Sequence, residues 1–263
     1  MHNDFGNDMP KRMAVWKHAT DEAQVNEIKV DNYDTSVGIE VFYNFPSVES
    51  MGSILYVIYG DGRILVYNKF EIEKGTLPNM PKVGISMQIP KEFDAMTWFG
   101  RGPHENYLDR KSSAKVDIYS GKVSDQIHPY IRPQESGNKT DVRWATFRNV
   151  DGDGLLVRGL LSLNASHYLQ EDYDHGFGEM KSGATGNIKT TKQQRHSIDM
   201  VERELINLDI DLVQMGLGGE DSWWAQPLEK YQIKPKNYDY SFTLIPIKSD
   251  ENPVELNKNA FLK

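Results

Sequence analysis

Acidic, basic and aromatic side chains are concentrated in two turn-rich segments, residues 98–110 (WFGRGPHENYLDR) and residues 128–138 (HPYIRPQESGN). A histidine beside a carboxylate suits proton transfer near neutral pH, so His104 with Glu105 or Glu135 is a candidate acid/base pair. The competing interpretation is that such carboxylates pair with arginines, including Arg132, and order two long loops against a sheet. We favour this second interpretation and assign no catalytic residue.

A third segment, residues 215–227 (MGLGGEDSWWAQP), combines three glycines with two acids and two adjacent tryptophans. Glycine lacks Cβ, so such a loop can turn tightly and bring its backbone close to a neighbour. The flat, amphipathic rings of Trp223 and Trp224 suit the apolar face of a sugar, or equally the cap of a hydrophobic core. Glu220 and Asp221 are adjacent, and we interpret them as shaping the loop rather than cleaving a bond.

Several other chemistries are disfavoured. The chain has no cysteine, which excludes disulfides, cysteine-ligated zinc and a thiol nucleophile. Residues 151–154 (DGDG) begin like a calcium loop, but Leu155 stands where a further ligand is needed, so a hairpin turn is preferred. Asp172, Asp174 and His175 are better explained as a solvated helix end. We therefore predict no metal or cofactor site in this chain.

The candidate segments must be positioned by strands, because apolar residues recur at every second position along most of the sequence. Residues 9–24 are interpreted as weakly helical, residues 166–174 as the one good helix, and residues 181–196 as a polar, mobile segment. The long loop at residues 121–141 is unusual in a compact domain unless it carries function. Strands are predicted at residues 37–43, 54–59, 64–72, 83–89, 93–99, 115–119, 142–150, 155–161, 208–212 and 238–244.

Length and charge limit the class of protein. The chain has 263 residues with no internal repeat or linker, which indicates one all-β domain. A formal net charge of −8 argues against nucleic acid and anionic membranes as partners. No apolar run approaches the roughly 20 residues of a membrane-spanning helix.

Four blocks, in order along the chain, resemble the C-terminal, small-chain domain of glycoside hydrolase family 2 β-galactosidases. They are residues 3–7, 98–110, 129–138 and 216–223. The resemblance implies a galactose-mutarotase-like β-supersandwich with one or two short helices, formed by residues 1–263 as a single domain. Family domains usually carry strands ahead of the first block, so we interpret the chain as truncated at its N-terminal end, with a sheet edge left open.

The resemblance also implies a role. In whole enzymes of this family the catalytic glutamates lie in a central barrel, which often uses Mg and Na, and the small-chain domain adds a tryptophan to the sugar pocket. By this resemblance, the family's tryptophan corresponds to Trp223, whereas Trp224 departs from the family pattern. We therefore expect a chain that is inactive alone, with a β-galactoside, the barrel and other domains as partners.

The same resemblance implies a bacterial, homo-oligomeric parent located in the cytoplasm or the periplasm. Two alternatives remain open. One is a free-standing galactose-mutarotase-like epimerase that uses His104 or His128 with a glutamate. The other is a non-catalytic carbohydrate-binding module in which the two tryptophans bind galactosides without chemistry.

Overall fold

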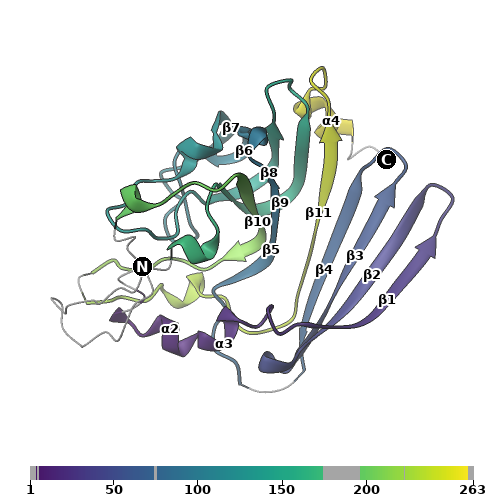
Figure 1. Ribbon diagram of the computed structural model, residues 1–263. Coiled ribbons are helices and arrows are strands. Elements are labelled where there is room, and N and C mark those ends of the chain that lie inside the picture. The colour runs from purple at the N-terminus through teal and green to yellow at the C-terminus, as the bar shows by residue number, and fades with distance from the viewer. Residues whose placement is uncertain (1–3, 5, 74–75, 174–195, 222, 260–263) are drawn as a thin grey trace.

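The computed structural model describes residues 4, 6–73, 76–173, 196–221 and 223–259. These residues form one antiparallel sheet of eleven strands with a few short helices at its margins (Figure 1). The all-β class is therefore confirmed. The predicted mobile segment at residues 181–196 lies almost wholly outside the described residues, as do Asp174 and His175.

The strands alternate in direction, and each of the ten predicted runs falls on one of them. The tight turns at Gly62 and Gly152 have φ values of 85° and 86°, which favours glycine there. The strands are β1 (Gln24–Asn32), β2 (Ser36–Phe45), β3 (Ser50–Tyr59), β4 (Ile64–Ile72), β5 (Lys82–Pro90), β6 (Ala95–Gly102), β7 (Lys115–Lys122), β8 (Lys139–Arg148), β9 (Gly154–Ser166), β10 (Leu205–Gln214) and β11 (Tyr238–Ile247).

The helices are short. The weakly helical start is confirmed as α2 (Met9–Arg12) and α3 (Ala14–Lys17), and α4 (Pro253–Asn259) was not predicted. Asn252 caps α4, since its side-chain oxygen accepts the N–H of Val254 at 2.9 Å. Single 3₁₀ turns lie at Pro46–Val48, Lys91–Phe93, Val123–Gln126, Gln170–Tyr173, Ser197–Asp199 and Glu229–Tyr231.

The helix predicted at residues 166–174 is wrong. Strand β9 continues to Ser166, and only a 3₁₀ turn at Gln170–Tyr173 follows it. Just before that range, Leu163 and Ala165 face the hydrophobic core while Asn164 between them faces the other way and bonds to Glu135, which is the alternation of a strand. Strand β9 pairs with β10 as far as Ser166, which lies opposite Asn207, so the first residue of the predicted helix belongs to the sheet. Beyond it the chain turns, since the N–H of Leu169 donates to Oδ2 of Asp172 and the N–H of Asp172 donates to the carbonyl oxygen of Leu169.

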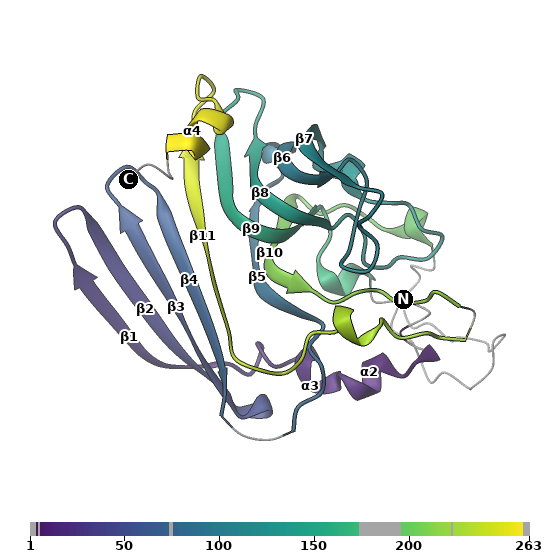
Figure 2. The same cartoon turned by 180° about the vertical axis from the view of Figure 1, so that it is seen from behind.

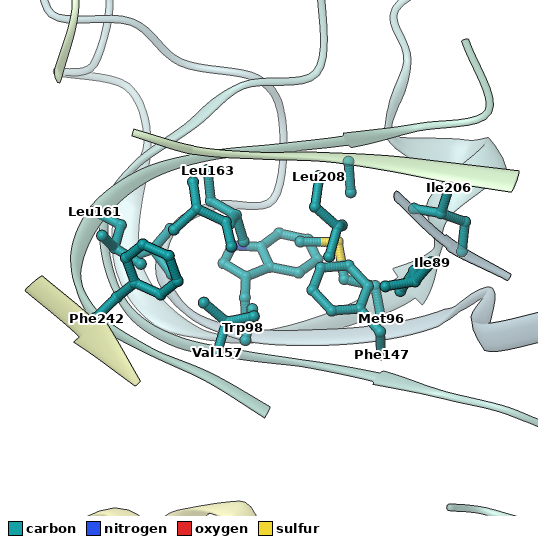
Figure 3. Packing of buried hydrophobic residues seen from close by; sticks show 14 of the residues in the cluster. Ile89, Met96, Trp98, Phe147, Val157, Leu161, Leu163, Ile206, Leu208 and Phe242 are labelled. Carbon is teal, nitrogen blue, oxygen red and sulfur yellow. The ribbon is translucent and has the colours of Figure 1, made fainter. Parts of the chain in front are cut away.

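Strand β9 divides the sheet into two branches. Its first half pairs with β11 and its second half with β10, while β8 follows its other edge. The branch of β10 and β5 can therefore turn across the sheet. Figure 3 shows Ile206 and Leu208 of β10 lying opposite Trp98 of β6 and Phe147 of β8, with the main core between them.

The other branch carries strands β1 to β4, which we call the outer sheet. It extends away from the body in both views and joins it through β11 (Figures 1 and 2). Val30, Ile39, Tyr56 and Val66 are neighbours across its four strands, so they share one face. Val66 is 1% exposed but Val30 is 58% exposed, and this apolar face therefore loses its cover towards β1.

Candidate functional site

Residues 215–227, which we call the tryptophan loop, follow β10 directly. Hydrogen bonds fix its base: Gly216 donates to the carbonyl oxygen of Tyr231, and Gly219 to that of Ala225, both at 2.9 Å. Gly218 and Gly219 have φ values of 65° and 78°, a region in which side chains are disfavoured. A Cβ on Gly218 would lie 2.6 Å from the oxygen of Ala225, so the tight turn requires glycine.

The carboxylate of Asp109 lies beneath this turn. Its Oδ2 accepts the N–H of Gly218 at 2.8 Å. A Cβ added to Gly216 would stand 2.7 Å from the carboxyl carbon of Asp109, so the backbone rests directly on the side chain. Two of the sequence blocks, 98–110 and 216–223, are thus in contact.

The two tryptophans have different surroundings. Trp223 is 83% exposed, and its backbone N–H donates to Oδ1 of Asp221 at 2.7 Å. Trp224 is 39% exposed and has a φ of 68°, unusual for a residue with a side chain. A Cβ on Gly6 would stand 2.0 Å from the ring of Trp224, so this ring packs on the backbone of the N-terminal segment. Trp223 is therefore the ring presented outward, and Trp224 the ring that packs inward.

Beneath the loop, the N-terminal helices complete a small hydrophobic cluster. Met13, which follows α2, packs with Met80, Val83, Met215 and Ile233, and all five are buried. Trp16 of α3 packs against the same cluster and donates its ring N–H to the carbonyl oxygen of Pro78. The first residue of the tryptophan loop is thus part of a packed core.

The two turn-rich blocks are joined through a buried asparagine. The side-chain oxygen of Asn106 accepts the backbone N–H of Thr140 at 2.8 Å, and its backbone oxygen accepts the side-chain N–H of Asn138 at 2.8 Å. Asn106 and Asn138 are both 0% exposed. Buried polar groups are stable only when hydrogen-bonded, so these amides hold the two loops in one arrangement.

The candidate acid/base residues His104 and Glu105 each bond to other groups. Glu105 accepts the hydroxyl of Tyr130 and the N–H of Gly137. Burial, and then the hydrogen bond to Glu105, raise the pKa of Tyr130 to about 12, so its hydroxyl stays a donor. His104 is exposed, and its Nε2 lies 3.0 Å from the hydroxyl of Ser113. The carboxylate of Glu105 thus orders loops, and His104 points to a serine.

Glu135 and Arg132 also serve the loop. Oε1 of Glu135 accepts the side-chain N–H of Asn164 at 2.8 Å, and Oε2 accepts that of Gln170 at 3.3 Å. The carbonyl oxygen of Arg132 accepts the side-chain N–H of Gln134 at 3.3 Å. Among the described residues, none of these contacts joins Glu135 to His104, so the two do not form an acid/base pair.

The loops cover a polar face of the β9 and β10 pair. Asn164 lies opposite Asp209, and Ser162 lies opposite Asp211, on the face away from the main core. Lys82 of β5 forms an ion pair with Asp209 at 2.9 Å. Sequence alternation marked this strand but carried no sign that its acidic face is buried.

Asp211 is a buried carboxylate on this polar face. It is 1% exposed, and neither carboxylate oxygen has a hydrogen-bond partner among the described residues. Burial raises its pKa well above the ordinary value, against the attraction of Lys82 and with the repulsion of Asp209. A Cβ on Gly84 would overlap Oδ1 of Asp211, so only glycine fits opposite it.

Within the described ranges, no group of three or more histidine, aspartate or glutamate side chains is arranged to hold a metal ion. In the same part of the chain, no helix is long and apolar enough to cross a membrane.

Comparison with known proteins identifies the family. Residues 1–244 match the model of the β-galactosidase small chain. The chain is 34% identical over 251 residues to the β-galactosidase of Priestia megaterium, covering 93% of this chain and 22% of that protein. It is 33% identical over 204 residues to the β-galactosidase of Pseudoalteromonas haloplanktis, covering 77% of this chain and 17% of that protein. The chain therefore spans about a fifth of the length of these relatives.

A family model that matches residues 1–244 and relatives that match most of the chain show that this all-β chain belongs to the β-galactosidase small-chain family. Among solved structures, it is similar to a GalM/aldose epimerase homologue from C. elegans, with a TM-score of 0.39 and 9% identity, covering 86% of this chain and 70% of that one.

Proposed function

We propose that this chain is the small-chain domain of a larger β-galactosidase that hydrolyses terminal β-D-galactosides. In this proposal the chain supplies an aromatic wall to the sugar pocket and leaves the bond cleavage to another domain. The observation that carries the proposal is the outward ring of Trp223, 83% exposed at the tip of a loop whose base is tightly bonded. An exposed aromatic face is suited to the apolar face of a sugar ring.

The outer sheet supports the proposed partnership with other domains of the same enzyme. On β1, Val25, Ile28 and Val30 are each more than half exposed, and they continue the apolar face that enters the core at Val66. A contiguous exposed apolar face of this kind marks an interaction surface. We expect neighbouring domains of the parent enzyme to cover it.

The test is made in the enzyme that carries this domain. Trp223→Ala should raise KM for a β-galactoside roughly two- to tenfold, because one aromatic contact contributes roughly 0.5–1.5 kcal/mol and a factor of ten is about 1.4 kcal/mol. Trp223→Phe should restore most of the loss. Leu228→Ala is a matched control, since Leu228 is also apolar and 58% exposed near the end of the same loop. Unaltered kinetics in Trp223→Ala would remove the assigned role.

The isolated chain separates the remaining candidates. We expect it not to hydrolyse a chromogenic β-galactoside, and turnover by the pure chain would contradict a non-catalytic role.

One observation favours the epimerase alternative: His128 and Glu202 line the same surface pocket of about 180 Å³, beside Tyr130 and Tyr173. An NMR assay of anomer interconversion decides it, because a null rate counts against any epimerase. A galactose titration that perturbs tryptophan fluorescence in the isolated chain would favour a binding module instead.

A further inference from the structure

The tryptophan loop needs a firm support if its outermost ring is to stand in one place. It contains three glycines, and glycine restricts the backbone less than any other residue. Its base is tied by the bonds of Gly216 and Gly219 to Tyr231 and Ala225. Between those two bonds, the described contact of the Gly218 N–H is with a side chain 109 positions away in the sequence, that of Asp109.

Asp109 itself is rigidly held. It lies in the turn between Tyr107 and Arg110, where the N–H of Arg110 donates to the oxygen of Tyr107 at 2.9 Å. Tyr107 is 1% exposed, and its neighbour Asn106 is fully buried and accepts the side-chain N–H of Asn138 in the second block with its backbone oxygen. A carboxylate on such a base is a fixed acceptor rather than a flexible one.

The chemistry of the contact favours a carboxylate. An ionised acceptor makes a shorter and stronger hydrogen bond to a backbone N–H than a neutral acceptor does. The second oxygen of Asp109, Oδ1, is buried, and among the described residues it has no hydrogen-bond partner and Asp109 forms no ion pair. The described interaction of this carboxylate is therefore directed to the glycine turn.

The fit is also steric. The Cα of Gly216 rests on the carboxyl group, since an added Cβ would stand 2.7 Å from both Cγ and Oδ2 of Asp109. The same Cβ would stand 3.0 Å from Cβ of Tyr231. The turn is thus held between Asp109 on one side and Tyr231 on the other.

We propose that Asp109 is the positioning residue of the tryptophan loop, and that it sets the place of Trp223 at the sugar pocket. The placement of Trp223 at a sugar pocket rests on the proposed function, whereas the anchoring of the loop by Asp109 does not. Asp109 touches no substrate in this scheme and acts through Gly218 and Trp223.

The first experiment measures the loop alone, in the full 263-residue chain. Amide hydrogen exchange is followed residue by residue in Asp109→Ala, in Asp109→Asn and in Asp125→Ala, an exposed acid that serves as the control. We expect exchange at Gly218 to rise at least tenfold in Asp109→Ala, with smaller changes in Asp109→Asn, because the amide keeps an acceptor oxygen. Unchanged exchange at Gly218, in a variant with the wild-type circular dichroism spectrum, overturns the anchoring.

The second experiment uses the enzyme that carries this domain. Asp109→Ala should raise KM with little change in kcat, Asp109→Asn should restore KM, and adding Asp109→Ala to Trp223→Ala should cause no further loss. Full additivity of the two substitutions overturns positioning through Trp223. If exchange rises at Gly218 but neither Trp223→Ala nor Asp109→Ala alters KM, the proposed function fails while the anchoring of the loop by Asp109 is supported.

Discussion

The backbone of Gly6 lies against the indole ring of Trp224, close enough that a methyl group on Gly6 would stand 2.0 Å from two ring carbons. This contact joins the N-terminal segment to the tryptophan loop. It also explains how a tryptophan keeps a left-handed backbone conformation, with φ of 68°, which costs roughly 1–2 kcal/mol for a residue with a side chain. The packing of the ring offsets that cost.

Gly6→Ala should displace the ring of Trp224. We expect greater acrylamide quenching of tryptophan fluorescence, with an unchanged far-ultraviolet circular dichroism spectrum, because the main core does not include this contact. Gly60→Ala is the matched control, since a Cβ on Gly60 would meet nothing within 4 Å. Equal quenching in the two variants would show that the ring does not depend on Gly6.

Removing each tryptophan should affect stability differently. Trp223 is 83% exposed, so Trp223→Ala should change the free energy of unfolding by no more than about 0.5 kcal/mol. Trp224→Ala should destabilise more, because it removes the contact with Gly6 and leaves the unfavourable φ in place. Urea unfolding of the two variants checks this order, and a larger loss in Trp223→Ala would reverse our assignment of the inward ring.

Asp211→Asn should stabilise the protein at neutral pH. Burial raises the pKa of Asp211 above 3.8, so between pH 3.8 and that raised value the folded state holds a proton that the unfolded chain has lost. Stability therefore falls as the pH rises through this window. We expect the variant to gain roughly 1–3 kcal/mol at pH 7 and little at pH 4.

Urea unfolding of wild type and Asp211→Asn at pH 4, 5, 6 and 7 measures this difference. Asp125→Asn, at an exposed position, is the control. A gain that is the same at pH 4 and pH 7 would show that the carboxyl charge is not its cause.

Lys139 should give the opposite trend in the alkaline range. It is 1% exposed, donates to the oxygen of Gly137 and lies 5.3 Å from the ring centre of Trp98. Burial, partly opposed by Glu105, lowers its pKa from 10.5 to about 8. Between these values the unfolded chain binds the extra proton, so stability should rise with pH, by at most roughly 1.4 kcal/mol per pH unit.

Lys139→Met removes that proton and should flatten the rise between pH 8 and 10, as measured by urea unfolding. Lys115→Met is the control, because Lys115 is exposed on β7. The prediction fails if wild type and Lys139→Met keep the same slope.

The strands were predictable because their signal is local. Val37, Ile39, Val41 and Tyr43 face one side of β2 whatever lies further along the chain, and the turns at Gly62 and Gly152 need only their own φ. The helix predicted at residues 166–174 was wrong because the polar residues of this segment are compatible with a helix surface as well as with the end of a strand. The pairing of Ser166 with Asn207 of β10, more than 40 positions away, keeps in the sheet the residue at which the helix was expected to begin.

The site was predictable only as separate blocks. The three glycines of residues 215–227 indicate a tight turn from the sequence alone. The hydrogen bond from Gly218 to Asp109 could not be predicted, because it joins two segments that are far apart in the sequence. Which tryptophan points outward depends on the φ of Trp224 and on Gly6, neither of which adjacent residues report. In the sequence, Asp209 and Asp211 have the pattern of a solvent-exposed face of β10. They are buried because the loops cover that face in the fold.

The joint between β4 and β11 has a mechanical consequence. Strands β1, β2 and β3 pair only with one another and with β4, so the outer sheet is tied to the rest of the described ladder by the single seam from Tyr238–Phe70 to Leu244–Ile64. Parts of a protein with few contacts to the remainder open as cooperative units at lower free energy than the whole. Val66, Ile54, Tyr56 and Ile64 of β3 and β4 pack into the main core, so the edge strands β1 and β2 are the part of the outer sheet that should open first in the isolated chain. A neighbouring domain that covered their apolar face would hold them in place.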